Sequence, residues 1–181
     1  PTRVIAFTGG EPFMNPDIHD MLDDVLKRGF EALVLTNAMR PMMRQNHRLL
    51  ALHERYGDRL TLRVSIDHPV REKHEEIRGA GSWDPMIEGL TWLAAHGFNV
   101  AIAGRTLFGG RQADLRAAYG GLAADAGLDL DAHDPAQLIL FPEMDERADV
   151  PEISVGCWDV LGVDPADMMC ASSRMVVKRK G

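Results

Sequence analysis

The stretch Thr8-Gly9-Gly10-Glu11-Pro12 follows the apolar run Val4-Ile5-Ala6-Phe7 and precedes a helix-start signal, Asn15-Pro16-Asp17. Two adjacent glycines at the carboxyl end of a strand let the backbone approach a ligand closely, because no Cβ stands in the way. The carboxylate that follows them can bind a ligand ammonium at short range. Ligands of α/β folds sit at the carboxyl ends of strands, so this stretch predicts a ligand-binding loop. A Gly-Gly turn with a solvated glutamate is the alternative interpretation.

The composition is that of an ordinary globular protein. Its 181 residues are 45% hydrophobic and 26% charged, which excludes a disordered chain. A formal net charge of -7 argues against a general nucleic-acid binder, which normally carries a basic face. No apolar run approaches the length of a membrane span. The two cysteines give no disulfide framework, so we expect a soluble protein of the reducing cytoplasm.

Short β-rich runs alternate with segments of helical spacing along the chain. The runs predict five strands, at residues 3–8, 31–37, 60–67, 98–105 and 137–141. Apolar residues at helical spacing predict helices that end at glycines, namely Gly29, Gly57, Gly97 and Gly127. Ser82 is expected to cap the third of these helices, with Pro85 in its first turn.

This βα repeat predicts an α/β fold with a parallel sheet, either an incomplete barrel or an open sheet. We favour a partial (β/α) TIM-like barrel, truncated at its N-terminus, because no Gly-x-Gly-x-x-Gly follows the first strand as it would in a Rossmann fold. The pattern degrades after Pro142. We therefore expect a barrel core at residues 1–142 and, at 143–181, a C-terminal extension that is a candidate start of an auxiliary region.

Polar side chains stand where the apolar strands stop. They include Thr36-Asn37, Ser65-Ile66-Asp67-His68, Arg105-Thr106 and Phe141-Pro142-Glu143. The carboxyl ends of strands in a βα fold converge on one mouth. Carboxylates, hydroxyls and a guanidinium at that mouth suggest a ligand that carries an amine, hydroxyls and a carboxylate.

At this point the chain resembles the radical S-adenosylmethionine (radical SAM) enzymes. The resemblance is carried by four motifs in the family's order and spacing, and it covers roughly residues 3–142. They are Thr8-Gly9-Gly10-Glu11-Pro12, Leu35-Thr36-Asn37-Ala38, Arg63-Val64-Ser65-Ile66-Asp67 and His74-Glu75-Glu76-Ile77-Arg78-Gly79, the last of which we expect to be a loop.

The resemblance implies which residues bind the cofactor. They are Gly9, Gly10, Glu11, Pro12, Asn37, Ser65, Asp67, Arg105 and Phe141. Residues 9–11 would hold the methionine ammonium of S-adenosylmethionine, and Ser65 with Asp67 would meet the ribose hydroxyls. Arg105 would pair with the methionine carboxylate, a task suited to a fork of donors. Residues 140–142 would lie along the adenine, and Asn37 would have a supporting role.

The resemblance also implies a reaction. A [4Fe–4S] cluster, supplied with an electron by a donor such as flavodoxin or ferredoxin, would cleave S-adenosylmethionine reductively. The resulting 5′-deoxyadenosyl radical would abstract hydrogen from a peptide or small-molecule substrate. We expect neither a nucleic-acid nor a membrane partner.

The family's cluster motif, Cys-x-x-x-Cys-x-x-Cys, does not occur in the chain. In the family it precedes the Gly-Gly-Glu strand, so we expect the cluster ligands to lie before residue 1 and this chain alone to be inactive. Cys157 and Cys170 are candidate ligands of an auxiliary cluster, although two cysteines do not complete such a site. Free buried thiols are the commoner use of cysteine.

Two alternatives stay open. The first is a catalytically silent relative that binds S-adenosylmethionine or a partner protein without a cluster. The second is an unrelated βα-barrel enzyme that acts on a phosphate or carboxylate substrate through Glu11, Asp67 and Arg105 directly. We expect helix-surface or loop positions for His47, His53, His74 and His96, whereas His68, next to Asp67, is a candidate to face the mouth.

Overall fold

The computed structural model describes residues 2–106, 111–142, 154–162, 164, 166 and 173–177, and the chain divides into two compact units, Pro1–Glu143 and Met144–Gly181. The first unit is built on a five-stranded parallel sheet. Its strands are β1 (Val4–Phe7), β2 (Glu31–Thr36), β3 (Leu60–Ser65), β4 (Asn99–Arg105) and β5 (Leu138–Phe141). All five expected strands are therefore present.

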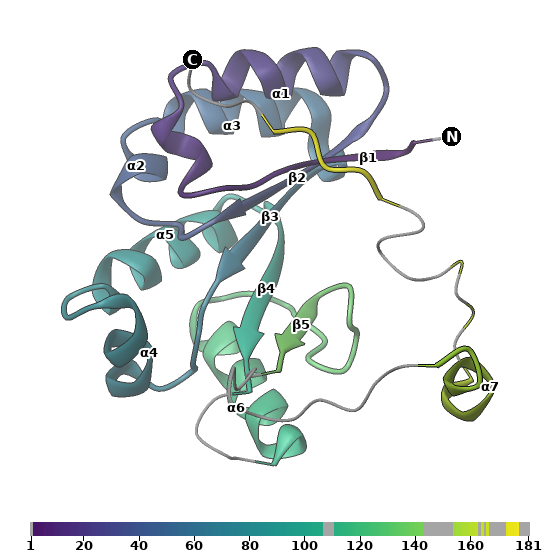
Figure 1. Cartoon of the computed structure of the whole chain (residues 1–181). Helices are drawn as coiled ribbons and strands as arrows, with labels where there is room; N and C mark the ends of the chain where they lie inside the picture. Colours follow the sequence, from purple (N-terminus) through teal and green to yellow (C-terminus); the bar gives the residue numbers. More distant parts are fainter. Residues whose placement is uncertain are drawn as a thin grey trace. The chain divides into compact units, whose positions relative to one another are not determined.

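The strand order is β1-β2-β3-β4-β5, and every neighbouring pair is parallel. A doubly wound Rossmann sheet reverses its order at a switch point, whereas successive addition on one side is the order of a βα barrel. β1 and β5 stand at the two ends of this order, so the barrel is open between them (Figure 1). The expected α/β fold with a partial barrel is confirmed.

Helices connect the strands and cover one face of the sheet. In the first unit they are η1 (Pro12–Met14), α1 (Ile18–Lys27), α2 (Arg40–Met43), α3 (Asn46–Tyr56), η2 (Gly57–Arg59), α4 (Arg71–Arg78), α5 (Trp83–Ala95) and α6 (Gln112–Asp125). Figure 1 shows α1 and α3 side by side along β1 and β2, with α6 beside β4 and β5. In the second unit, α7 (Cys157–Leu161) ends at Gly162 in the left-handed conformation.

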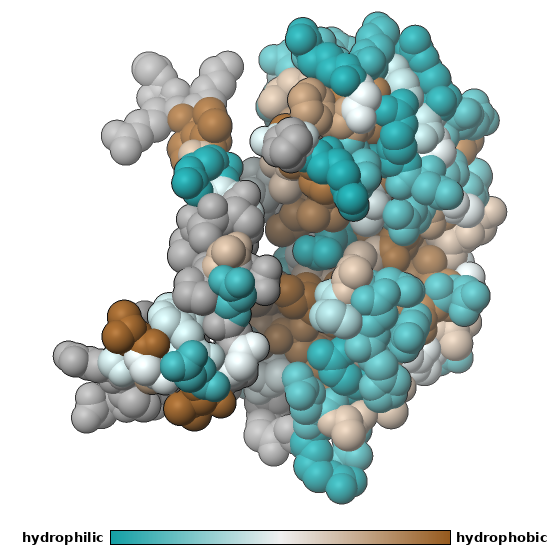
Figure 2. All heavy atoms as spheres, turned by 90° about the vertical axis from the view of Figure 1, so that its right-hand side faces the viewer, coloured by the Kyte–Doolittle hydropathy of each residue, from teal (hydrophilic) through white to brown (hydrophobic). Residues whose placement is uncertain are grey.

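Burial alternates along the strands. On the face that packs against the helices, Val34, Leu62 and Ile102 are completely buried. The side chains that alternate with them point to the other face, which we call the inner face of the sheet. On β2 and β3 these side chains are half-buried: Leu33, Leu35, Thr61, Arg63 and Ser65. Figure 2, which views the molecule from the right of Figure 1, shows hydrophobic side chains gathered in the hollowed middle of this side.

Two close contacts fix the ends of the strands against the helices. A Cβ on Gly89 of α5 would lie 1.7 Å from the carbonyl oxygen of Ala38, so only glycine lets α5 approach the turn after β2. Ala38 is itself buried and has a left-handed φ of 56°. A Cβ on Gly104 of β4 would lie 2.4 Å from the hydroxyl of Tyr119, which is completely buried on α6.

Helix α4 corrects the expectation of a loop at residues 74–79. Of its eight residues only His74 is buried. Because Ile77 is the only apolar side chain beside it, the segment carries too little hydrophobic periodicity to predict a helix. His74 was also expected on a surface or in a loop, yet it is completely buried against the edge of Trp83, with 5.5 Å between ring centroids.

The start of α5 differs from expectation as well. Ser82 occupies the N-cap position, but its side chain makes no capping hydrogen bond. The carboxylate of Glu75, on α4, does this instead by accepting the backbone N–H groups of Gly81 at 3.1 Å and Trp83 at 3.2 Å. A carboxylate there also suits the positive end of the helix dipole.

Among the described helices, none is long and apolar enough to cross a bilayer.

Replacing Gly89 with alanine should lower the free energy of unfolding by about 2 kcal/mol or more, because the new Cβ overlaps the Ala38 carbonyl. Gly121→Ala is the matched control, since that glycine lies on α6 with no atom within 4 Å of its added Cβ. There the change should raise stability by up to about 1 kcal/mol through helix propensity. Urea unfolding followed by circular dichroism measures both, and equal effects would contradict the close contact.

The buried His74 should make stability fall in mild acid. Burial, and next the nearby positive charge of Arg78, lower the pKa of His74 from its ordinary 6.5. The unfolded chain therefore binds the proton more readily than the folded one, so the free energy of unfolding should fall as pH drops below about 6.5. His74→Leu should reduce this dependence in unfolding titrations between about pH 7.5 and 5.5. The same substitution at exposed His133 is the surface control; a pH dependence unaltered in His74→Leu would refute the assignment.

Candidate functional site

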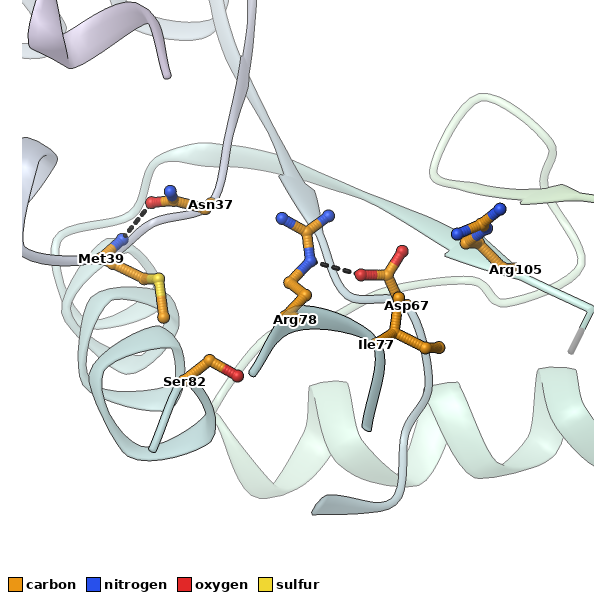
Figure 3. Close-up of a pocket in the computed structure, with 7 residues that line it drawn as sticks. All are labelled: Asn37, Met39, Asp67, Ile77, Arg78, Ser82 and Arg105. Atoms are coloured by element: carbon orange, nitrogen blue, oxygen red, sulfur yellow. Dashed lines mark hydrogen bonds and ion pairs between the residues drawn. The ribbon is translucent and has the colours of Figure 1, made fainter. Parts of the chain in front are cut away.

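A cavity of about 420 Å³ lies where β2, β3 and β4 end, within the size range of small-molecule sites. It is lined by Asn37, Met39, Asp67, Ile77, Arg78, Ser82 and Arg105 (Figure 3). Side chains from three strand ends and from the α4–α5 region thus meet in one place. The parallel sheet brings this about, because its carboxyl ends all lie along one edge.

The loop after β1 needs both of its glycines for their backbone conformation. Gly9 has a φ of 101° and Gly10 a φ of 49°, in the region that side chains rarely adopt. A Cβ on either residue would meet no atom within 4 Å in the described part of the chain. The backbone of this loop is therefore accessible to a ligand.

The Glu11 carboxylate fastens this loop to the end of β2. Its Oε1 accepts the backbone N–H of Phe13 at 3.1 Å and the hydroxyl of Thr36 at 2.9 Å. Its Oε2 accepts the backbone N–H of Asn37 at 2.8 Å. A carboxylate has about four acceptor positions, so these three bonds leave one on Oε2. Glu11 is thus first a structural group and only secondarily able to meet a ligand.

Asn37 stands in a turn that its own side chain stabilises. Its Oδ1 accepts the backbone N–H of Met39 at 2.9 Å, and Thr36 Oγ1 accepts that of Ala38 at 3.1 Å. The amide oxygen of Asn37 is therefore engaged in the turn. Its amide nitrogen is left without a partner among the residues drawn in Figure 3, where only the amide oxygen is bonded to Met39.

Asp67 and Arg78 form an ion pair at the centre of the cavity wall. Arg78 Nε donates to Asp67 Oδ2, and the side chains are 30% and 10% exposed. Figure 3 draws only one oxygen of Asp67 bonded to Arg78, so the second is available to a hydroxyl. The carboxylate of Asp67 is thereby held in position before any ligand arrives.

Arg105 ends β4 above the buried hydroxyl of Tyr119. That hydroxyl donates to the carbonyl of Ile66 at 2.7 Å, next to Asp67 in the chain. Burial raises the pKa of Tyr119 well above its ordinary value, and a hydrogen bond from the backbone of Arg105 opposes the shift. One hydroxyl therefore holds the ends of β3 and β4 together. Within the described residues, the Arg105 guanidinium has no carboxylate at ion-pair distance.

Ser82 brings an unsatisfied polar atom to the cavity. The residue is 8% exposed, and its Oγ is buried without a hydrogen-bond partner. A buried hydroxyl that lacks a partner costs free energy, so most such groups are bonded. Because Ser82 lines the cavity, a ligand there can supply the missing bond.

The structure brings together some of the predicted site residues. Asn37, Asp67 and Arg105 line the cavity, and Glu11 is bonded to the backbone of Asn37. Ser65 precedes Asp67 by two residues on the inner face of the sheet. Phe141 is paired in register with Arg105 on β5, and its side chain is 46% exposed. The remaining members stand in the loop after β1 and do not line the cavity: Gly9, Gly10 and Pro12.

Four cavity residues were not predicted as site residues: Met39, Ile77, Arg78 and Ser82. For Arg78 a signal existed, since it belongs to the motif at residues 74–79. Ser82 was interpreted as a helix cap, and only the capping bonds of Glu75 show that its hydroxyl is spare.

The described residues give no support for a metal site at the candidate cluster ligands. No group of three or more His, Cys, Asp or Glu residues in the described ranges could hold a metal ion. Cys157 is a free, half-buried thiol with its Sγ 3.8 Å from the Oγ of Ser154. Cys170 lies outside the described residues.

Sequence comparison identifies a family. The model of the radical SAM superfamily matches residues 1–115. The chain is 33% identical over 97 residues to the antilisterial bacteriocin subtilosin biosynthesis protein AlbA of Bacillus subtilis, covering 53% of this chain and 21% of AlbA. It is 32% identical over 90 residues to the mycofactocin maturase MftC of Mycobacterium tuberculosis, covering 50% and 22%. The chain thus spans about a fifth of the length of these relatives.

Solved structures share the fold. SuiB of Streptococcus suis, in its crystal structure with S-adenosylmethionine, superposes with a TM-score of 0.60 at 13% identity, over 81% of this chain and 31% of SuiB. The crystal structure of SuiB with the precursor peptide SuiA gives a TM-score of 0.53 at 14% identity, over 70% and 27%.

Replacing Glu11 with glutamine should lower the free energy of unfolding by about 2–3 kcal/mol, because an amide accepts less strongly and turns its NH₂ toward donors. Glu31→Gln is the matched control at the start of β2. Its partner Arg3 is 82% exposed, so the change should stay within about 0.5 kcal/mol. Chemical unfolding measures both variants, and a Glu11→Gln variant as stable as the control would refute the fastening role.

Proposed function

Because this chain belongs to the radical SAM superfamily, we propose that its strand ends bind S-adenosylmethionine and that the protein containing it modifies a peptide. Members of the family bind S-adenosylmethionine and a [4Fe–4S] cluster. Membership removes the alternative of an unrelated βα-barrel enzyme. The observation that carries the proposal is the cavity itself, in which Asn37, Asp67 and Arg105 converge from three strands.

The residues present fit the chemical groups of S-adenosylmethionine. The exposed backbone at Gly9 and Gly10, with the remaining acceptor position of Glu11, suits the ammonium. Arg105, with no carboxylate at ion-pair distance among the described residues, suits the methionine carboxylate. Ser65 and the second oxygen of Asp67 suit the ribose hydroxyls.

Further residues complete the fit. Phe141, 46% exposed at the end of β5, offers its ring to the adenine. Ser82 offers its unsatisfied hydroxyl, and Asn37 and Pro12 support the loop. The Asp67–Arg78 pair holds the Asp67 carboxylate in place, so this side chain loses little conformational freedom when the ligand binds.

The cluster lies beyond what this chain's described residues can hold, since they include no trio of thiolates. We therefore propose that the cluster ligands lie before residue 1. When bound and reduced, the cofactor supplies a 5′-deoxyadenosyl radical for hydrogen abstraction. The chain's own residues orient the cofactor and hold its charged ends, with electrons from a small donor protein such as flavodoxin or ferredoxin. We place this chemistry in the cytoplasm.

A peptide is the favoured substrate over a small molecule. Two sequence relatives are a bacteriocin biosynthesis protein and a maturase, and SuiB was crystallised with a precursor peptide. The open inner face of the sheet, half-buried along β2 and β3, is a surface on which an extended substrate can lie below the cofactor.

The test uses the gene product that includes the sequence before residue 1, reconstituted anaerobically with iron and sulfide. It should bind S-adenosylmethionine in calorimetry and release 5′-deoxyadenosine after reduction. Arg105→Gln should weaken binding by about 10- to 100-fold through loss of charge-assisted hydrogen bonds. Arg111→Gln, which removes an exposed partner of Asp114 outside the cavity, should bind normally.

Each failure has a distinct meaning. A folded, cluster-loaded protein that does not bind S-adenosylmethionine would refute the proposal. Binding without release of 5′-deoxyadenosine would identify the chain as a catalytically silent relative.

A further inference from the structure

Arg63 occupies an unusual place on the inner face of the sheet. It lies in the middle of β3, the central strand, and pairs in register with Leu35 on β2 and Ala101 on β4. Its cross-strand neighbours on that face are thus apolar, whereas Thr61 and Ser65 flank it along β3 itself. The helix-facing neighbours Leu62 and Val64 are completely buried, whereas Arg63 is half-buried and can be reached from the open side.

The guanidinium of Arg63 is poorly satisfied. Nη2 donates to the carbonyl of Ala136 at 3.3 Å, which means that the side chain reaches across β4 to the residues before β5. Nε is buried and has no hydrogen-bond partner. No carboxylate of the described residues lies at ion-pair distance. Desolvation lowers the pKa of Arg63 below its ordinary value, yet an arginine remains protonated in proteins.

An unpaired cation among apolar side chains is costly, and proteins normally pair such a charge. A fold that needed only a spacer at this position could use an aliphatic side chain at lower cost. A planar fork of donors is the group that proteins use to hold a carboxylate by two parallel hydrogen bonds. The missing partner of Arg63 is therefore an anion that comes from outside the described residues.

We propose that Arg63 is a substrate-specificity residue that binds the carboxylate of an acidic side chain of the peptide substrate. This inference rests on the proposed function. Arg63 precedes Ser65 by two residues on the same face, which places it about 7 Å below the strand ends that hold the cofactor. On this proposal the carboxylate belongs to the peptide, which lies below the cofactor.

The surroundings of Arg63 leave room for such a group. Ala101 and Ala103 present only methyl groups on the inner face of β4, beside Arg63 and Ser65. Leu33 on β2 and Ile139 on β5 extend the apolar wall, and both are half-buried. Figure 2 shows the hydrophobic hollow on this side of the molecule. A peptide segment with one acidic and otherwise apolar side chains matches this pattern.

The test uses the gene product with its cluster reconstituted and saturated with S-adenosylmethionine. The probes are two capped alanine tripeptides, one with a central glutamate and one with a central glutamine. The glutamate peptide should bind at least tenfold more tightly in calorimetry. Arg63→Gln should abolish this preference, and Arg63→Lys should weaken it because the fork of donors is lost. Arg111→Gln, exposed and paired with Asp114, should leave it unchanged.

Two further measurements keep the outcomes distinct. Cofactor binding and 5′-deoxyadenosine release by Arg63→Gln should match the wild type. These two measurements test the proposed function, whereas the ratio of the affinities for the two peptides tests the role of Arg63. The melting temperature of Arg63→Gln should be unchanged or higher, because a half-buried cation without an ion-pair partner among the described residues is removed. Equal affinity for the two peptides, or a peptide preference that survives in Arg63→Gln, would overturn the proposal. So would a lowered melting temperature, which would show that Arg63 serves the fold instead.

Discussion

The geometry of the strand ends depends on the hydrogen bonds that the Glu11 carboxylate accepts. This carboxylate gathers three donors, from the backbone of Phe13, the hydroxyl of Thr36 and the backbone of Asn37. Hydrogen bonds to an ionised acceptor are about twice as strong as neutral ones, and they are directional. The loop after β1 is thereby held to the end of β2. Gly9 and Gly10, whose backbone has positive φ, directly precede this carboxylate, which is bonded to the backbone of Asn37 in the cavity wall.

The other strand ends are held from the helix side by close packing. Gly89 admits the Ala38 carbonyl against α5, and Gly104 admits the Tyr119 hydroxyl against β4. Because Tyr119 also bonds the carbonyl of Ile66, the ends of β3 and β4 share one anchor. These contacts hold the backbone at the strand ends without using the Arg105 side chain, which lines the cavity. Side chains such as Arg105 can then meet a ligand without first breaking internal bonds.

Charge is distributed unevenly over this chain. Its net charge is -7, yet the cavity and the inner face of the sheet carry the guanidiniums of Arg63, Arg78 and Arg105, of which Asp67 neutralises one. Positive charge in a concave, partly apolar region concentrates anionic ligands there. On the functions proposed above, two carboxylates would be bound at different depths, one from the cofactor at the rim and one from the substrate below it. The layered arrangement follows from the two-residue period of β3, which places Arg63 and Ser65 on one face, with Asp67 in the loop that follows the strand.

The sequence by itself determined the five strands, the parallel βα order and the family. Those features depend on local hydrophobic runs and on motifs such as residues 8–12, which a linear pattern records. Tertiary structure decided what those residues do. Two of the three partners of Glu11 are 25 and 26 residues away, and the hydroxyl of Tyr119 bonds a carbonyl 53 residues away. The helix at α4, the capping by Glu75 and the unsatisfied hydroxyl of Ser82 likewise arise from neighbours in space. A hydrogen bond needs an atom within about 3 Å, and only the folded chain decides which atoms those are.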